Sequence, residues 1–240
     1  SFVQRLNFLS RAQTWLPLFT LIAASLVGLA DDLLQIFGKG KYIAGGMRFS
    51  RRLLLILLIA AIGAWWFYSK LEISSVHVPF VGEFQLGLLF PLFFMFVMVA
   101  TFSGGVIDGI DGLAGGVMAA AFSAYAGIAF FQNQIDLATF SATIIGSLLA
   151  FLWFNIPPAR FYMGESGMMG LTTTLTVVAF LTDSVMVLPI IALPLVLAGG
   201  STAIQLFSKR FFKRKAFPVA PFHHYLESIG WAPYTVTMRF

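Results

Sequence analysis

The sequence predicts an all-α, polytopic helical membrane protein, and this fold class rests on composition and on the length of its apolar stretches. Of 240 residues, 59% are hydrophobic and only 10% are charged, and the mean hydropathy is +0.88. A water-soluble domain carries about 25% charged residues, so a soluble enzyme, disorder and fibrous architecture are excluded. Seven apolar stretches approach the roughly 20 residues that a helix needs to cross a bilayer.

The seven expected transmembrane helices form a single membrane domain over residues 1–240. In chain order they are residues 16–30, 53–68, 86–102, 113–131, 137–154, 168–181 and 185–207. The first and sixth are short and are expected to extend into their flanks. In residues 73–84, Val76, Val78 and Phe80 stand beside paired glycine and proline, which predicts a short hairpin. Both ends of the sequence stop abruptly, which predicts a piece of a longer protein.

Basic residues cluster in two loops, and the positive-inside rule places both loops in the cytoplasm. The clusters are Lys39, Lys41, Arg48, Arg51 and Arg52, and Lys209, Arg210, Lys213, Arg214 and Lys215. If the chain alternates sides, the cytoplasmic loops lie at about 31–52, 103–112, 155–167 and 208–233. Lys70 is then the only basic residue in an external loop.

Charge and cysteine content exclude several classes of site. The chain has no cysteine, so disulfides, thiolate nucleophiles and cysteine-ligated metals are ruled out. The net charge of +5 is typical of nucleic-acid binding in soluble proteins. In a membrane protein the position of the basic residues matters more than their sum, so no nucleic-acid partner is expected.

Six of the ten acidic residues fall on the expected cytoplasmic side. They are Asp31, Asp32, Asp108, Asp111, Glu165 and Glu227. A carboxylate near lipid is costly and is a functional candidate for that reason, although solvated helix caps are the alternative. Asp108 and Asp111, three residues apart, share a helix face and can hold a hard cation or a proton. The alternative for these two Asp-Gly pairs is a local Asx-turn.

Two further segments carry polar groups beside the membrane. Residues 155–167 combine Asn155, a proline break, a cation and Glu165, which favours a site over a simple turn. His223, His224 and Glu227 follow the second basic cluster. Adjacent histidines do not match the i, i+4 spacing of a helical zinc pair, so a loop that contacts phosphate is the better interpretation. Carboxylate-bound Mg²⁺ would neutralise part of a diphosphate's charge there.

At these residues the chain resembles the phospho-N-acetylmuramoyl-pentapeptide transferases, a family of the polyprenyl-phosphate N-acetylhexosamine-1-phosphate transferase superfamily. The motifs are Asp-Asp, Asp-Gly-Ile-Asp-Gly-Leu-Ala, Asn-x-x-Pro-Ala-x-x-x-Met-Gly-Glu-x-Gly and Ala-Pro-Phe-His-His-x-x-Glu. The resemblance extends from Gly28 to about Trp231. The family has ten spans, so it implies that this sequence lacks the first two and the last.

The resemblance implies an Mg²⁺-dependent glycosyl-1-phosphate transferase in the bacterial inner (plasma) membrane, with its active site facing the cytoplasm. The reaction transfers phospho-N-acetylmuramoyl-pentapeptide from its UDP donor to undecaprenyl phosphate, which gives UMP and the first lipid-linked peptidoglycan precursor. A homodimer is compatible with it. The implied catalytic residues are Asp31, Asp32, Asp108 and Asp111, the metal ligands Glu165 and Asp108, and the substrate-binding residues Asn155, Arg52, His223, His224 and Glu227.

Four departures from the family pattern bear on activity. Glu165 stands where the family has a metal-binding aspartate, and Arg52 where it usually has lysine. Residues 102–105 contain no asparagine, and Tyr225 replaces the third histidine of a usual triplet. Three alternatives therefore stay open: a related UDP-N-acetylhexosamine:polyprenyl-phosphate transferase, a catalytically silent relative, and a transporter. A transporter places ionisable groups near the bilayer midplane, whereas those here gather at one interface, which favours an enzyme.

Overall fold

The structure, a computed structural model, describes residues 14–38 and 46–240. Its long helices are α2 (Trp15–Ile36), α3 (Phe49–Trp65), α4 (Phe90–Ser103), α5 (Leu113–Phe131), α6 (Ile135–Asn155), α7 (Gly164–Leu181) and α9 (Leu193–Phe211). Its short helical segments are η3 (Trp66–Lys70), η4 (Gly87–Leu89), η5 (Gly104–Ile107), η6 (Val185–Val187), α8 (Leu188–Ile191), α10 (Phe222–Ser228) and α11 (Pro233–Arg239). Lys39 and Lys41 of the first basic cluster lie outside the described residues. The all-α fold class is confirmed.

Each of the seven apolar stretches is helical, but not all of them make a straight span. Among the described residues, five segments are long and apolar enough to cross a membrane: Trp15–Ile36, Phe49–Lys70, Gly87–Ile107, Leu113–Phe131 and Ile135–Asn155. The expected seventh span is broken: Val185–Ile191 and Leu193–Phe211 meet at an angle of 84°, and together they give a sixth span if counted as one. Prolines at positions 189 and 194 flank the break at Ala192, where each removes a backbone donor.

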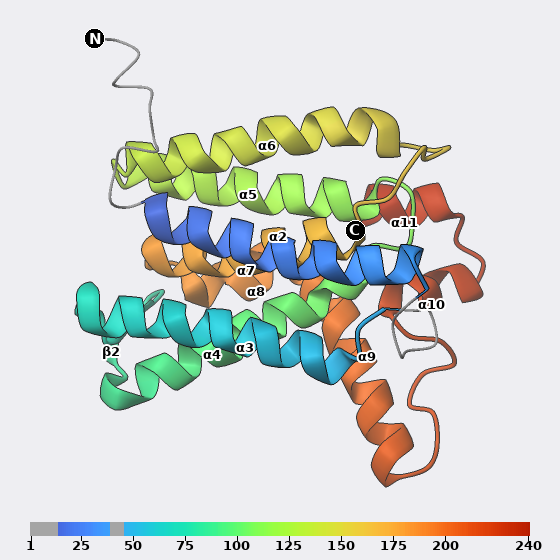
Figure 1. The fold of residues 1–240 in the computed structure, drawn as a ribbon, viewed down its shortest axis with the longest axis horizontal. Coiled ribbons are helices and arrows are strands. Elements are labelled where there is room, and N and C mark those ends of the chain that lie inside the picture. The colour runs from blue at the N-terminus through green and yellow to red at the C-terminus, as the bar shows by residue number, and fades with distance from the viewer. Residues whose placement is uncertain (1–13, 39–45) are drawn as a thin grey trace.

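Helix α7 is the expected sixth span, and it forms the centre of the bundle. It packs against α2, α4 and α5 (Figure 1), and every residue from Met168 to Phe180 is buried. Buried threonines lower its hydropathy, but their hydroxyls donate back to helix carbonyls, as Thr172 does to Met168 at 2.6 Å and Thr173 to Met169 at 2.8 Å. A helix of this polarity is stable there because protein, rather than lipid, surrounds it.

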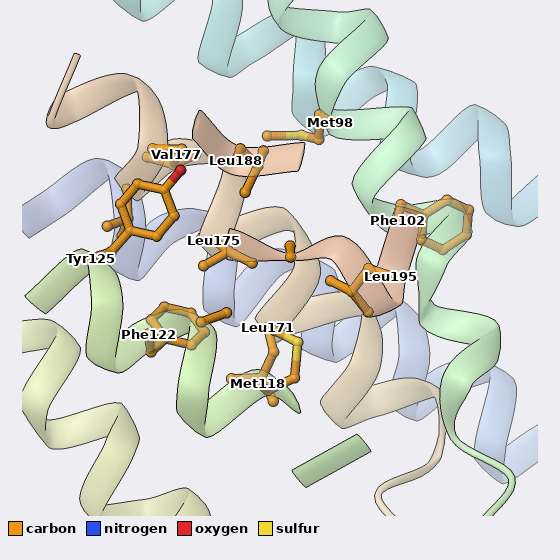
Figure 2. Packing of buried hydrophobic residues seen from close by; sticks show 14 of the residues in the cluster. Met98, Phe102, Met118, Phe122, Tyr125, Leu171, Leu175, Val177, Leu188 and Leu195 are labelled. Carbon is orange, nitrogen blue, oxygen red and sulfur yellow. The ribbon is translucent and has the colours of Figure 1, made fainter. Parts of the chain in front are cut away.

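The core fills the space between α7 and its neighbours. Figure 2 shows buried side chains of α4, α5 and α7 converging with Leu188 of α8 and Leu195 of α9. At one end of α7, Phe180 makes ring contacts with Phe67, Phe90 and Phe94, with centroids between 4.8 and 5.9 Å apart. Such tilted and edge-on aromatic pairs add to the energy of apolar burial.

Glycines allow α2 and α7 to approach each other closely. A Cβ atom on Gly28 of α2 would lie 2.3 Å from the carbonyl oxygen of Glu165, and one on Gly170 of α7 would lie 2.1 Å from the Ser25 hydroxyl. Small residues at such positions let the backbones of membrane helices come together. The contact brings the carboxyl end of α2 beside the amino end of α7.

The predicted hairpin is confirmed at one end of the bundle. Strands β1 (Ser75–Val78) and β2 (Gly82–Gln85) pair antiparallel, with His77 opposite Glu83. In Figure 1 this hairpin lies at the left end, whereas α10 and α11 lie at the opposite end. The two ends of the bundle therefore carry different polar structures.

Candidate active site

The amino end of α7 is held by two aspartates from other elements. Asp32, on α2, accepts hydrogen bonds from the backbone N–H groups of Glu165 and Ser166 at 3.2 and 3.0 Å, and from the Ser166 hydroxyl at 2.9 Å. Asp108, which follows η5, accepts one from the N–H of Gly164 at 2.9 Å. Free N–H groups and the helix dipole make a helix amino end favourable for anions. The two aspartates therefore cap helix α7, which is distant from both of them in the sequence.

Two opposing effects set the pKa of Asp108. Burial raises the pKa of this carboxyl above its ordinary value, hydrogen bonds from the backbone of Gly164 and Met163 lower it, and the nearby Asp32 raises it again. The balance is a raised pKa. A cation or a bound proton at this position relieves the repulsion between the two carboxylates.

Arg52 of α3 lies between two carboxylates. Its guanidinium donates to Glu165, at the start of α7, and lies 3.4 Å from Asp31 of α2. Asp31 is buried, and it also accepts hydrogen bonds from the backbone of Met47 and, at 3.0 Å, from Gln35. Asp31 and Asp32 therefore face different neighbours, as their 100° separation on a helix predicts.

Asp111 and Asn155 organise the next loop. Asp111 accepts hydrogen bonds from the Tyr162 hydroxyl at 2.6 Å and from the N–H of Ala159 at 3.0 Å, and these two bonds hold the pKa of its carboxyl below the ordinary value. Asn155 is buried at the end of α6, where its Oδ1 accepts from the N–H of Gly112 at 3.1 Å and its Nδ2 donates to the carbonyl of Phe161 at 2.9 Å. Both side chains join residues 108–112 to residues 155–167.

The two histidines of α10 are placed differently. His223 is fully buried, and within the described part of the chain neither of its ring nitrogens has a hydrogen-bond partner. Burial, followed by the neighbouring His224, lowers the pKa of His223 to about 4. His224 is partly exposed and its Nδ1 lies 2.6 Å from Glu227. The Nε2 atoms of both rings face Gly109, 3.7 and 3.1 Å from the position that a Cβ atom would take there.

An apolar groove of about 580 Å³ reaches the Arg52–Glu165 pair. Its lining residues are Phe49, Arg52, Phe102, Ser103, Gly105, Val106, Glu165, Met168, Met169, Gly199, Thr202, Ala203 and Leu206. Arg52 and Glu165 contribute charged groups to this lining, whereas Phe49, Val106 and Leu206 contribute exposed apolar side chains. Beside α4 and the bend before α9 lies a second apolar hollow of about 330 Å³. It shares Ser103, Gly199 and Ala203 with the apolar groove.

A second groove of about 560 Å³ lies beside residues 109–111, and we call it the polar groove because Asp111, Tyr162, Glu227 and Tyr234 line it. Its lining residues are Gly109, Ile110, Asp111, Pro157, Pro158, Tyr162, Glu227, Pro233 and Tyr234. The apolar groove contains Glu165 and the polar groove contains Gly109, which are the neighbours of the bonded pair Gly164 and Asp108. The residues that line the two grooves are therefore linked through the bond between Gly164 and Asp108.

The carboxylates at this end can contribute to a magnesium site. Asp108 and Glu165 supply the oxygen ligands that Mg²⁺ prefers, and an N–H bond to a carboxylate leaves further lone pairs free for a cation. Within residues 14–38 and 46–240, no three carboxylates at this end have ligand oxygens within 4.8 Å of one another. A magnesium ion held by these carboxylates would take the rest of its shell from water and substrate phosphate, which is the usual mode for this ion.

Several residues that contact the aspartates at this end occupy no specified position of the sequence motifs. Tyr162 bonds to Asp111, Ser166 bonds to Asp32, and Thr237 of α11 donates to the carbonyl of Asp111 at 2.9 Å. Tyr162 and Ser166 stand within residues 155–167, so their place in a loop with Glu165 was a usable signal. Thr237 lies 126 positions from its partner, and the sequence around it has no matching feature.

Comparisons with known proteins agree on one family. A family model described as glycosyl transferase family 4 matches residues 14–183. The phospho-N-acetylmuramoyl-pentapeptide-transferase of Latilactobacillus sakei subsp. sakei is 33% identical over 228 residues, which cover 94% of this chain and 70% of the relative. The protein of the same name from Chloroflexus aurantiacus is 32% identical over 98% of this chain and 67% of the relative. That of Anoxybacillus flavithermus is 33% identical over 95% of this chain and 70% of the relative.

Proposed function

The chain belongs to glycosyl transferase family 4, and we propose that it transfers phospho-N-acetylmuramoyl-pentapeptide from UDP to undecaprenyl phosphate. The relatives at 32% and 33% identity bear the name of this activity. One structural observation carries the proposal: the apolar groove reaches Arg52 and Glu165 at the amino end of α7, and the polar groove lies beside residues 109–111, next to the Asp108 that bonds to that end. A reaction between a lipid phosphate and a water-soluble nucleotide needs both kinds of groove at one point.

The acceptor fits the apolar groove. A polyprenyl tail is a long apolar chain with methyl branches, and its transfer from water to an apolar surface is favourable along its whole length. Its phosphate would lie beside Arg52, whose planar guanidinium suits phosphate recognition. Asp31 is buried beside Arg52, so its role is to hold the guanidinium in place, while Asp32 holds α7.

The donor fits the polar groove. Tyr162 and Tyr234 provide aromatic surfaces for a uracil or sugar ring, and His224 faces Gly109 at its edge. His223 is too buried to contact the donor directly, so its role is to support this turn. Asn155 likewise positions residues 112 and 161. Glu227 orients the His224 ring through the bond to Nδ1.

Transfer then joins the two substrates across α7. An oxygen of the lipid phosphate attacks the β-phosphorus of the donor, the bond from that phosphorus to the bridging oxygen breaks, and UMP leaves. Because two anions meet, the barrier is largely electrostatic, and Arg52 lowers it by placing positive charge beside the reacting groups. A magnesium ion held by Asp108 and Glu165 would supply further positive charge at the transferring phosphate. Asp111 positions Tyr162 and the 155–167 loop.

The orientation follows from charge. Arg48, Arg51 and Arg52 lie at the start of α3, and Lys209 and Arg210 at the end of α9, so the end with both grooves is the cytoplasmic one. A nucleotide donor made in the cytoplasm reaches the polar groove from this side. The protein then lies in the inner (plasma) membrane of a bacterium.

Turnover of a labelled donor tests the proposal. The full-length protein in detergent is given fluorescent UDP-N-acetylmuramoyl-pentapeptide and undecaprenyl phosphate, and UMP and the lipid product are measured. We expect a lipid-linked product with this donor and none with UDP-N-acetylglucosamine. Glu72→Gln, a change at the opposite end of the bundle, is the matched control for variants of the site. A folded protein that releases no UMP would contradict the proposed activity, and exclusive use of UDP-N-acetylglucosamine would assign it to a related branch.

A further inference from the structure

Three metal-ligating side chains gather at the end of the bundle opposite the two grooves. His77 of β1 and Glu83 of β2 are cross-strand partners, and Asp183 follows α7. One ligand atom from each of the three lies within 4.8 Å of the others, and among the described residues no other group of this kind is found. The backbone N–H of His77 also donates to Asp183 at 3.1 Å, so the hairpin and the turn after α7 are in direct contact.

Hydrogen bonds from α5 and from the loop that follows it fix the turn that carries Asp183. Gln134 donates to the carbonyl of Leu181 at 3.2 Å, Gln132 to that of Thr182 at 2.9 Å, and Tyr125 to that of Ser184 at 3.2 Å. These bonds hold the backbone on both sides of Asp183.

Glu83 is also restrained, because the Ser75 hydroxyl donates to its Oε2 at 2.7 Å. Two of the three ligands are therefore positioned before any ion binds, which is the condition for a well-formed metal site.

We propose that His77, Glu83 and Asp183 bind a divalent transition-metal ion of the Zn²⁺ class. One imidazole nitrogen and two carboxylate oxygens suit zinc, which often keeps a water molecule in the fourth position. Magnesium and calcium prefer oxygen ligands alone. Ligand atoms of a tetrahedral zinc site lie about 3.4 Å apart, given metal–ligand distances of about 2.1 Å. The three side chains are exposed and can close the remaining gap by rotation.

The role of this ion would be structural. It would join the β1–β2 hairpin to the turn after α7, two segments that the bond from the His77 N–H to Asp183 already links. Helix α7 has 18 residues and is about 27 Å long at 1.5 Å per residue. Since Glu165 lies at its other end, the ion would touch neither substrate, and this proposal is independent of the proposed reaction.

Zinc titration of the untagged full-length protein tests the site. Protein in detergent is stripped with EDTA, dialysed and titrated with zinc sulfate by isothermal calorimetry. The variants are His77→Ala, Glu83→Gln and Asp183→Asn, with Glu72→Gln, another acidic side chain at this end, as control. Asp183→Asn keeps an oxygen that accepts the His77 N–H, so it preserves the fold. We expect each ligand variant to weaken one zinc site at least tenfold and the control to leave it unchanged.

The melting temperature provides a second measurement. Zinc should raise it in the wild type and in Glu72→Gln but not in Asp183→Asn. Zinc bound at His224 would remain in all variants, so it does not contribute to the difference between the variants and the wild type. The proposal is wrong if the wild type binds no zinc at micromolar concentration, or if all three ligand variants bind it as the wild type does. It is also wrong if only His77→Ala has an effect, since that indicates a lone surface histidine.

Discussion

Arg52 shares its charge between Asp31 and Glu165, and this makes the length of the Glu165 side chain informative. The Glu165 side chain is 35% exposed, whereas that of Arg52 is 17% and that of Asp31 only 1% exposed. Arg52 therefore lies between the buried Asp31 and the more exposed Glu165, and it lines the groove together with Glu165. Glu165 is thus both a partner of Arg52 and a candidate ligand for magnesium, and substitutions at this position separate the two roles.

Glu165→Gln keeps the size of the side chain and removes its charge. We expect at least a hundredfold loss of kcat, about 2.7 kcal/mol at the transition state, with folding intact because Asp31 still pairs with Arg52. Steady-state rates and a melting curve measure both. Glu165→Asp then tests whether the site has adapted to the longer side chain. An adapted site should lose activity, because the carboxylate is withdrawn by one methylene. A site that has not adapted should gain activity, because the family's aspartate is restored. If both variants turn over like the wild type, Glu165 is not a metal ligand.

His223 makes the stability of α10 depend on pH. Its folded pKa of about 4 lies below the ordinary value near 6.5, so the unfolded state binds more protons between these limits and stability falls as the pH drops. We expect the free energy of unfolding of α10 to fall by about 2 kcal/mol between pH 7 and pH 5. Amide hydrogen exchange, corrected for intrinsic rates, should be faster at pH 5 and measures this loss. His223→Gln cannot be protonated and should remove the slope whatever its effect on absolute stability. A wild-type slope that survives in this variant would show that another group titrates.

At the scale of elements, the contact between α2 and α7 determines where the site residues lie. A methyl group on Gly28 would meet backbone atoms of Glu165 and Ser166 at 2.3 and 2.5 Å, and a backbone cannot rotate away as a side chain can. The same two residues bond to Asp32, one turn further along α2. Displacing α2 therefore moves the cap and the Glu165 carboxylate together.

Gly28→Ala should cost both stability and rate. Overpacking of this kind costs about 1–3 kcal/mol, and the shift of α7 should reduce transfer at least tenfold. Gly127→Ala on α5 is the matched control, because a Cβ atom there has no neighbour within 4 Å. Reversible denaturation in mixed detergent micelles measures stability and donor turnover measures rate. Equal stability for the two variants would mean that α2 and α7 are not in this register.

The same elements show what could be predicted from sequence. Apolar length predicted the helices and the alternation of Val76 and Val78 predicted the hairpin, because both patterns are local. The 84° bend before α9 was missed because Pro189 and Pro194 are each compatible with the first turn of a helix. The central position of α7 was missed because its threonines are satisfied within the helix, which composition alone does not reveal.

For the site, the sequence predicted which side chains matter better than what they contact. Asp32 and Asp108 cap a helix more than fifty residues away in the chain, and such long-range pairs leave no periodic signal. The burial of His223 and the pairing of His77 with Asp183 likewise depend on tertiary packing. The order of the motifs indicated one end of the bundle as the site. The cluster of His77, Glu83 and Asp183 at the other end belongs to no motif.

For the whole molecule, the decisive property is that the two candidate metal sites lie at opposite ends of α7. If the membrane separates them, a chelator that cannot cross it should act on each site alone. We expect EDTA on the side of the basic loops to abolish transfer in sealed proteoliposomes, and Mg²⁺ or Mn²⁺, but not Zn²⁺, to restore it, since oxygen ligands suit the first two ions. EDTA on the other side should leave the rate unchanged and remove only zinc. Orientation is scored by protease cleavage within residues 209–215, and the donor is added on the same side. Inhibition from the hairpin side alone would reverse the topology, and inhibition from neither side would remove magnesium from the mechanism.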